Sequence, residues 1–564
     1  MNRRSFISTA AESVTAVEEI QKTTTVDNRF ANKALPDVMR TTSGLEEYTG
    51  VWGFEQVAHL LRRTMFAATK SDITDMTSLT LDEVVDTLLT DQSPPDAPLN
   101  TNNSDTGAPV GQTWVNAATN DFNNSRIFSL KAWWIGLMLN QSVSLREKMT
   151  LFWHNHFVTE SIDVRDARVS YRENALLRQN ALGNFKELTK QVTIHPAMLR
   201  YLNGNTNTRA NPNENYAREL QELFTIGKGP EIGPGNYTNY TEDDVKAAAR
   251  VLTGWRDDPQ TLTSTFVPNR HDPTNKQFSS AYGSWVIIGR TGSNGALEVD
   301  DLLDMIFDQD ETAKFICRKL YRWFVYYVID NSAEENVINP LAEILRNNNY
   351  DVKPVLKALF KSAHFFDSLN MGCMIKNPVD FVVGMSREFA LAFPPSSEFQ
   401  RQYNTWRYIH GQAAGMQMDI CDPPNVAGWS AYYQVPQYYQ LWINSDTLPK
   451  HNQFTDTLLK SGYTAGGFTL IADPIAFSLQ VSDPTDPNIL VSECAKLLFP
   501  IEITENQKTF LKNTLIPGLP DYEWTSEWND YINDPTNLGK RNAVRSKLQS
   551  LLSFMLGMAE YQLS

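Results

Sequence analysis

Apolar residues recur at intervals of three and four along most of the chain. The first clear stripe consists of Val51, Phe54, Val57, Ala58, Leu61 and Met65. This spacing puts the apolar side chains on one face of a helix, which packs against a core. The same period predicts helices over 81–89, 126–140, 144–158, 172–193, 214–226, 242–253, 301–308, 311–329, 335–346, 352–364, 378–393, 453–461, 488–498, 505–515 and 541–561. We therefore predict a mainly α fold: a large multi-helix globular protein with irregular insertions and at most a small β-hairpin.

Capping residues indicate where some of these helices begin and end. Ser144 and Glu147 have the spacing of a capping box, in which the hydroxyl and the carboxylate each accept a hydrogen bond from a free backbone N–H group. Thr241 and Asp244 repeat this spacing, and Gly254 is suited to ending the helix that follows. We expect helices to begin near residues 145 and 242.

Two long segments have no helical period. Residues 91–113 are rich in Pro, Asn, Asp, Thr and Gly, which predicts a surface loop that can cover a cleft. Residues 255–300 are similar but contain one β-like run at 284–288, which predicts an irregular insertion with a hairpin. No unit recurs at a fixed period, so a solenoid is not expected.

Length and charge narrow the class of protein. The 564 residues correspond to roughly three to four domain-sized units. We divide them into a polar N-terminal arm (1–46), a helical core domain (47–450) and a C-terminal helical segment packed on that core (451–564). The formal net charge of −15 argues against a general nucleic-acid binder, which needs a basic face. No run of about 18 uncharged apolar residues is present, so no membrane-spanning helix is expected.

The four cysteines are widely spaced along the chain. Cys317, Cys373, Cys421 and Cys494 form neither a CxxC pair nor a disulfide framework. We expect buried or free thiols, with a single disulfide between Cys373 and Cys421 as the alternative.

The first residues are similar to an export signal. Arg3 and Arg4, followed by Phe6, match the core of the twin-arginine pattern. Three glutamates interrupt the apolar stretch that should follow. Two interpretations stay open: a degenerate signal of a periplasmic or extracellular protein, or a polar arm of a cytoplasmic one.

Two histidines lie at the end of the helix predicted over 144–158. His154 and His156 are two positions apart, so on a helix they point to nearly opposite sides. Both can ligate one metal ion only where the helix has ended. The alternatives are a single functional histidine that faces a cleft, or packed histidines whose ring nitrogens are satisfied by neighbours.

A second polar cluster contains three glutamates. Glu214, Arg218 and Glu222 are spaced four residues apart, which predicts a salt-bridged row that braces a helix. Glu219 shares an acidic face with Glu222, and such a face can hold one carboxyl group at a raised pKa for acid–base catalysis or bind a hard cation. Asn213 belongs to an asparagine-rich segment before the helix, a place suited to an anion or to sugar hydroxyls.

A third polar cluster lies in the irregular insertion. His271, Asp272 and Lys276 can together position a phosphate group or a metal ion. A turn stapled by Asp272 before Pro273 is the structural alternative. Haem binding by one of the eight histidines is a further alternative. The common hydrolase, metalloprotease and nucleotide-binding signatures do not occur.

These clusters, in this order, resemble the bacterial domain-of-unknown-function-1800 family. The resemblance rests on AHLLRR at 58–63, LREKM at 145–149, FWHNHF at 152–157, HPAM at 195–198, PNENYAREL at 212–220, DPPNVAGW at 422–429 and WIN at 442–444. It implies a mainly helical and often exported protein, frequently encoded beside a sulfatase-like protein, and it supplies no established activity.

The leading functional hypothesis is an extracytoplasmic, metal-dependent hydrolase that acts on a carbohydrate or on a phosphate or sulfate ester. Its candidate catalytic residues are Glu219, Glu214 and His271. Its candidate substrate-binding residues are Asn213, Arg218, Asp272, Lys276 and Trp429. Its candidate metal ligands are His154, His156 and Glu222, for a divalent metal ion as cofactor.

The alternative hypothesis is a non-catalytic partner or scaffold of a secreted or surface assembly. In that case the polar clusters only brace helices, and the aromatic segment 429–442 offers a contact surface. The candidate partner under either hypothesis is the sulfatase-like protein that the resemblance implies, and no nucleic-acid partner is expected.

Overall fold

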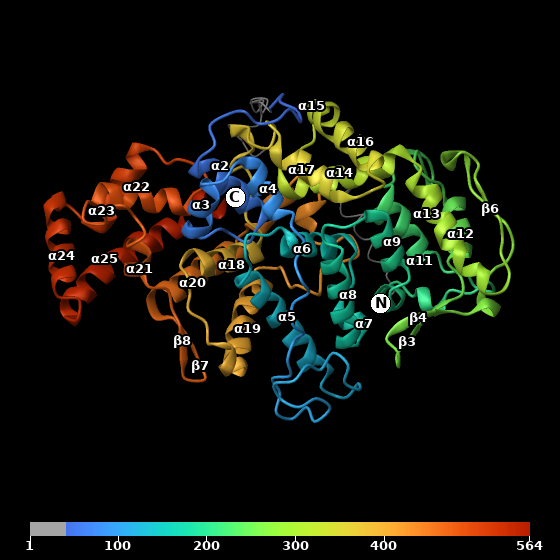
Figure 1. Cartoon of the computed structure of the whole chain (residues 1–564), viewed down its shortest axis with the longest axis horizontal. Helices are drawn as coiled ribbons and strands as arrows, with labels where there is room; N and C mark the ends of the chain where they lie inside the picture. The colour runs from blue at the N-terminus through green and yellow to red at the C-terminus, as the bar shows by residue number, and fades with distance from the viewer. Residues whose placement is uncertain (1–40) are drawn as a thin grey trace, which may run out of the picture. The chain divides into compact units, whose positions relative to one another are not determined.

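The computed structural model describes residues 41–564. The pattern at Arg3 and Arg4 lies outside the described residues. Helices dominate the described chain (Figure 1), which confirms the predicted mainly α fold. No helix within 41–564 is long and apolar enough to cross a membrane.

The part of the described chain up to residue 225 is mainly helical, apart from an irregular segment at 89–122. Its helices are α2 (Phe54–Thr64), α3 (Lys70–Thr77), α4 (Leu81–Leu88), α5 (Asn123–Leu139), α6 (Arg146–His156), α7 (Ser161–Val164), α8 (Ala167–Gln179), α9 (Phe185–Thr193), α10 (Pro196–Tyr201), α11 (Glu214–Glu219) and the π-helix η2 (Leu220–Thr225). Helices α5 and α6 bury most of their residues, so they belong to the core rather than to the surface.

Helices resume after a short irregular stretch. They are α12 (Glu242–Val251), α13 (Glu298–Phe307), α14 (Asp310–Phe324), α15 (Asn331–Ala333), the π-helix η6 (Glu334–Ile338), α16 (Asn339–Asn347), α17 (Val352–Lys361), α18 (Pro378–Glu388), α19 (Phe399–Gly415), α20 (Thr447–Asp456), the π-helix η11 (Thr457–Ser461), α21 (Pro474–Ser478), α22 (Pro487–Leu498), α23 (Glu505–Leu515), α24 (Asp521–Asn533) and α25 (Leu538–Gly557).

The strands within 41–564 form short antiparallel pairs. They are β1 (Glu231–Gly233) with β2 (Asn236–Tyr237), β3 (Trp255–Asp258) with β4 (Thr263–Phe266), β5 (Lys276–Gln277) with β6 (Val286–Ile287), and β7 (Tyr463–Ala465) with β8 (Phe468–Leu470). The insertion 255–300 thus contains two pairs, and the β-like run predicted at 284–288 supplies β6.

Of the two predicted capping boxes, one is confirmed and one is wrong. Thr241 and Asp244 make both hydrogen bonds of the box at the start of α12. Ser144 accepts from the N–H of Arg146 at 3.2 Å, but Glu147 does not reach back to the cap. The Glu147 carboxylate instead accepts from Arg178 at 2.8 Å in the interior. A buried ion pair thus takes the carboxylate that the capping box required.

The C-terminal helices α22–α25, drawn in red in Figure 1, pack on one another, and α25 also packs against α20 and α21. Tyr561 donates a hydrogen bond to Glu388 of α18 at 2.8 Å, and Arg62 of α2 donates to the carbonyl of Phe499 at 3.0 Å. All four cysteines are free thiols, so the Cys373–Cys421 disulfide does not form.

Candidate functional site

The acidic cluster is built at the junction of α11 and η2. The Asn213 side-chain oxygen accepts a hydrogen bond from the N–H of Asn215 at 3.0 Å and so caps α11. This oxygen is therefore engaged by the helix and does not face a ligand site. Arg218 contacts Glu214 at 3.3 Å and also holds both carboxylate oxygens of Glu242, at 2.5 and 2.7 Å. Two carboxylates therefore neutralise this guanidinium.

Glu222 does not extend the predicted row of Glu214 and Arg218. The backbone changes to a π-helix at Leu220, and its wider turn rotates the following side chains away from the α-helical face. Glu222 instead contacts Lys228 at 2.6 Å and accepts a hydrogen bond from the Tyr240 hydroxyl at 3.0 Å.

Glu219 differs from its neighbours in having no partner. It is half-buried at the last position of α11, and its carboxyl group makes no hydrogen bond or ion pair with the described residues. Burial and the nearby Glu222 carboxylate raise the pKa of Glu219 to about 7. A carboxyl group in this range exchanges its proton near neutral pH, as a general acid or base must.

The π-helix strengthens the case for this position. Single π turns within α-helices are rare and occur frequently at functional sites. Here the π turn directly follows Glu219 and directs Glu222 toward Lys228 and Tyr240. The arrangement leaves one acid partly buried and unpaired beside another that is fixed by two donors.

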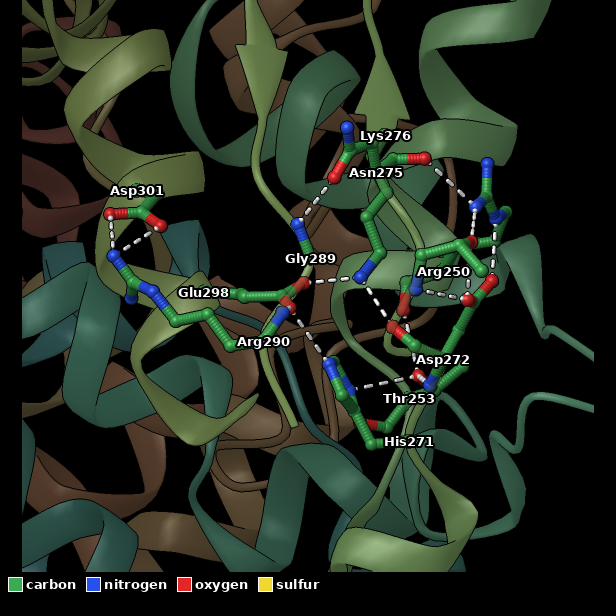
Figure 2. A network of polar contacts seen from close by, with 12 residues as sticks. Arg250, Thr253, His271, Asp272, Asn275, Lys276, Gly289, Arg290, Glu298 and Asp301 are labelled. Atoms are coloured by element: carbon green, nitrogen blue, oxygen red, sulfur yellow. Dashed lines mark hydrogen bonds and ion pairs between the residues drawn. The ribbon is translucent and has the colours of Figure 1, made fainter. Parts of the chain in front are cut away.

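The polar cluster of the insertion is a closed internal network (Figure 2). The Nε2 atom of His271 lies 3.0 Å from Oε1 of Glu298, and Lys276 pairs with the other oxygen of that carboxylate. The N–H of Arg290 also donates to Glu298, at 2.6 Å. His271 is 2% exposed, and Lys276 and Glu298 are fully buried. These side chains join the insertion to α13 and have no open face toward a substrate.

Asp272 staples a turn in the same network (Figure 2). Its carboxylate accepts from Arg250 at 2.7 Å and from the N–H of Thr274 at 2.9 Å. Burial opposes ionisation here, but these hydrogen bonds outweigh it and lower the pKa of Asp272 to about 2. The stapled turn is the structural alternative that the sequence left open, and Asp272 has no free oxygen facing a ligand in it.

The two histidines of α6 are packed against the protein interior. The Nε2 atom of His156 lies 3.0 Å from the carbonyl of Phe224, and its Nδ1 atom accepts from Lys319 at 3.1 Å. Nε2 of His154 accepts from the N–H of Cys421 at 3.1 Å. Burial lowers the pKa of His154 to about 3, so this ring is neutral.

The candidate metal ligands do not converge. Within 41–564 no group of three or more His, Cys, Asp or Glu side chains is arranged to hold a metal ion. His156 already uses both ring nitrogens for hydrogen bonds, and Glu222 is engaged by Lys228. The geometry is that of packed histidines, with both ring nitrogens satisfied in His156 and Nε2 satisfied in His154.

Trp429 is buried, so it does not form a substrate platform. The residue is 1% exposed, and its backbone N–H donates to the Asn155 side chain at 2.9 Å. Trp442, from the same aromatic segment, is also buried, whereas Tyr433 is 39% exposed. The segment 429–442 is therefore mixed: its two tryptophans are core, Tyr432, Tyr438 and Tyr439 are half-buried, and residues 433–437 are exposed.

Sequence reasoning missed a second polar cluster, in which a buried lysine pairs with two partly exposed acids. Lys131 of α5 bridges Asp419 at 2.5 Å and Asp422 at 2.6 Å. Between them Cys421 adopts a left-handed backbone with φ of 69°, which is strained for a residue other than glycine. The two acids flanking a cysteine directly before the DPPNVAGW motif were a visible signal, but the distant lysine that pairs with them was not.

A pocket of ligand size lies apart from all predicted site residues. Its volume is about 330 Å³, and its lining includes Trp133, Arg146, Tyr171, Arg178 and part of the 91–113 loop. The start of this loop thus lines a pocket, whose other lining residues the sequence did not single out.

Comparison with known proteins identifies the family of the chain but no activity, substrate or partner. No curated protein and no solved structure matches the chain. A family model described as "Protein of unknown function (DUF1800)" matches residues 59–563, nearly the whole chain. This match confirms the resemblance seen in the motifs, and the chain belongs to the DUF1800 family.

Proposed function

We propose that this protein hydrolyses glycosidic bonds, with Glu219 as the general acid and Glu222 as the carboxylate that acts beside it. The observation that carries the proposal is the contrast within the acidic cluster. Glu214, Glu222 and Glu242 are all ion-paired, whereas Glu219 has no partner among the described residues. Pairs of carboxyl groups in contrasting environments are typical of acid–base sites.

The chemistry of glycoside cleavage needs these two roles. A protonated carboxyl group donates its proton to the leaving oxygen, and a carboxylate activates water or stabilises the cationic sugar ring. Glu219, with a pKa of about 7, retains its proton in a large fraction of molecules at neutral pH. Lys228 and the Tyr240 hydroxyl fix Glu222 in position.

The charge around the cluster favours a neutral substrate. Arg218 and Lys228 are the cations nearest to the two carboxyl groups, and carboxylates occupy both of them. A phosphate or sulfate ester would therefore meet acidic groups without a free cation to bind it. A carbohydrate offers hydroxyl groups that suit carboxylate and amide partners, so the proposal narrows to carbohydrates.

The test is a screen of aryl glycosides and polysaccharides for sugar release, with and without a chelator, followed by variants of the active preparation. We expect Glu219→Gln to lower kcat/KM by about 10²- to 10⁴-fold, the range for loss of a general acid. The alkaline limb of the pH profile, set near pH 7 by Glu219, should disappear with it.

Glu214→Gln is the matched control, because Glu214 lies on the same helix and is ion-paired to Arg218. It should leave kcat/KM within about twofold of the wild type, since an exposed pair contributes little. Equal activity and the same pH profile for Glu219→Gln and the wild type would contradict the proposal. Loss of activity in the presence of the chelator would show that the hydrolysis depends on a metal ion.

We also propose that the protein works outside the cytoplasm, as the pattern at Arg3 and Arg4 suggests. Cell fractionation of the full chain tests this. Replacing both arginines by lysine should hold the protein in the cytoplasm, and unchanged fractionation of that variant would count against export by this route.

The second candidate function is a scaffold for the sulfatase-like protein that the family resemblance implies. It is favoured by two aromatic rings on the C-terminal helices. The ring centroids of Phe510 on α23 and Phe554 on α25 lie 4.8 Å apart, and the two residues are 52% and 44% exposed. If they form the contact surface, the sulfatase-like protein should co-purify with the wild type and not with Phe510→Ser/Phe554→Ser. Equal co-purification would remove this role.

A further inference from the structure

A small polar cavity is bounded by side chains from α2, α6 and α14 and from the 429–442 segment. Its lining includes Arg63, Lys148, Trp323 and Tyr432. The volume is about 20 Å³, which leaves room for one particle of the size of a water molecule.

Two donors beside this cavity have no acceptor within residues 41–564. Nε of Arg63 and Nε1 of Trp323 are buried and make no hydrogen bond with these residues. The two residues are only 3% and 5% exposed, so bulk water does not satisfy these N–H groups. Buried donors without a partner are rare in proteins, and each one calls for an explanation such as a bound ion or water.

The lining also has an excess of positive charge. Arg63 donates to the carbonyls of Val325 and Asn370, at 3.1 and 3.0 Å, but makes no ion pair with the described residues. Lys148 is paired with Asp380. A buried guanidinium without a carboxylate is unfavourable, so an anion beside it would stabilise the fold.

Arg62 adds to this excess. It also lines the cavity and donates to the carbonyls of Phe499 and Leu497, at 3.0 and 2.8 Å, without an ion pair to the described residues. Arg62, Arg63 and Lys148 thus line the cavity, whereas Asp380 is the one acidic side chain in its lining. The side chains around the cavity therefore carry an excess of positive charge.

We propose that this cavity binds one halide ion, held by Nε of Arg63 and Nε1 of Trp323. The Tyr432 hydroxyl accepts from Asn377 at 3.1 Å, which leaves its own proton free to donate to the ion. A monatomic anion fits the volume, whereas phosphate and sulfate are too large. It also accepts from every orphan donor without needing an acceptor itself, which a water molecule does need for its two hydrogens.

The bound ion would link three parts of the chain. Arg63 comes from α2, Trp323 from α14 and Tyr432 from the turn η9 (Ser430–Tyr432). Halide binding should therefore stabilise the folded protein in a saturable way, beyond any general effect of ionic strength.

The experiment measures thermal unfolding of the whole chain in sodium chloride, sodium bromide and sodium gluconate at one fixed ionic strength. We expect the Tm to rise and saturate with chloride and bromide relative to gluconate. Trp323→Phe removes one N–H donor and should weaken the apparent halide affinity roughly 10- to 100-fold. Trp406→Phe is the matched control, because Trp406 is also buried with an unpartnered Nε1 but does not line the cavity.

Crystals of the wild type grown in bromide give a second measurement that does not depend on a variant. An anomalous peak within hydrogen-bond distance of both Nε of Arg63 and Nε1 of Trp323 would support the proposal. A cavity that holds water alone in bromide would overturn it. Equal Tm in the three salts, or the same halide response in Trp323→Phe and Trp406→Phe, would do so as well.

Discussion

Removing the charge of Glu298 should promote local opening of the insertion 255–300, because it leaves the buried Lys276 without an ion-pair partner. Lys276 and Glu298 are both fully buried and pair with each other. Glu298→Gln keeps the shape and can still accept from His271 and Arg290, so the main loss is the charge opposite Lys276. Breaking a buried pair from one side costs about 3–5 kcal/mol.

The change can be measured by hydrogen exchange of the amides in 253–307, which reports local opening. A cost of about 3–5 kcal/mol corresponds to protection lower by roughly 100- to 4000-fold in Glu298→Gln. Lys276→Met/Glu298→Gln should recover most of that protection, because the double variant leaves no buried charge unpaired.

The control is an ion pair at the surface of the same helix. Lys186 contacts Asp304 of α13 at 2.5 Å, with both side chains partly exposed. Lys186→Met should change protection by less than about tenfold, since surface pairs contribute about 1 kcal/mol or less. The reasoning fails if Glu298→Gln behaves like Lys186→Met, or if the double variant is no better protected than Glu298→Gln.

The sequence predicted those helices and caps whose stabilising contacts lie between residues close together in the chain. The apolar period predicted most of the helices, and the box at Thr241 and Asp244 formed as its spacing indicated. One helix predicted over 172–193 is in fact two, α8 and α9, since Asn184 caps a new helix after Gly183. The apolar period continues across that break and hides it.

The polar clusters were harder to interpret, since their partners lie far along the chain. Glu147 has the spacing of a capping residue, yet Arg178, 31 residues later, takes its carboxylate. His271 and Lys276 looked like ligand-binding groups, because nothing in the sequence shows that Glu298 closes over both of them. A residue type reports what chemistry is available, and burial decides whether a ligand can reach it.

Glu219 is the candidate for which sequence and structure agree best. The sequence placed it on an acidic face where one carboxyl group can have a raised pKa, and burial beside Glu222 gives it one of about 7. The π turn that follows it was not predictable, because a shift from α to π hydrogen bonding leaves no apolar period of its own over six residues. That turn is why Glu222 meets Lys228 rather than Arg218.

Two further predictions concern single buried or half-buried groups. Cys373 is the one cysteine that is not fully buried, so a thiol reagent should label one thiol quickly in the native protein and four after denaturation; rapid native labelling of more than one would contradict this. Glu173 is 4% exposed, one of its oxygens has no partner within residues 41–564, and burial raises its pKa to about 8. The folded protein thus keeps a proton that the unfolded chain releases near pH 4.5, so stability falls as the pH rises from about 4.5 to 8. Glu173→Gln keeps the neutral shape and does not titrate. It should match the wild type near pH 4 and exceed it by a few kcal/mol at pH 8 in denaturant unfolding, whereas a stability difference that is the same at both pH values would show that Glu173 is not protonated in the folded protein.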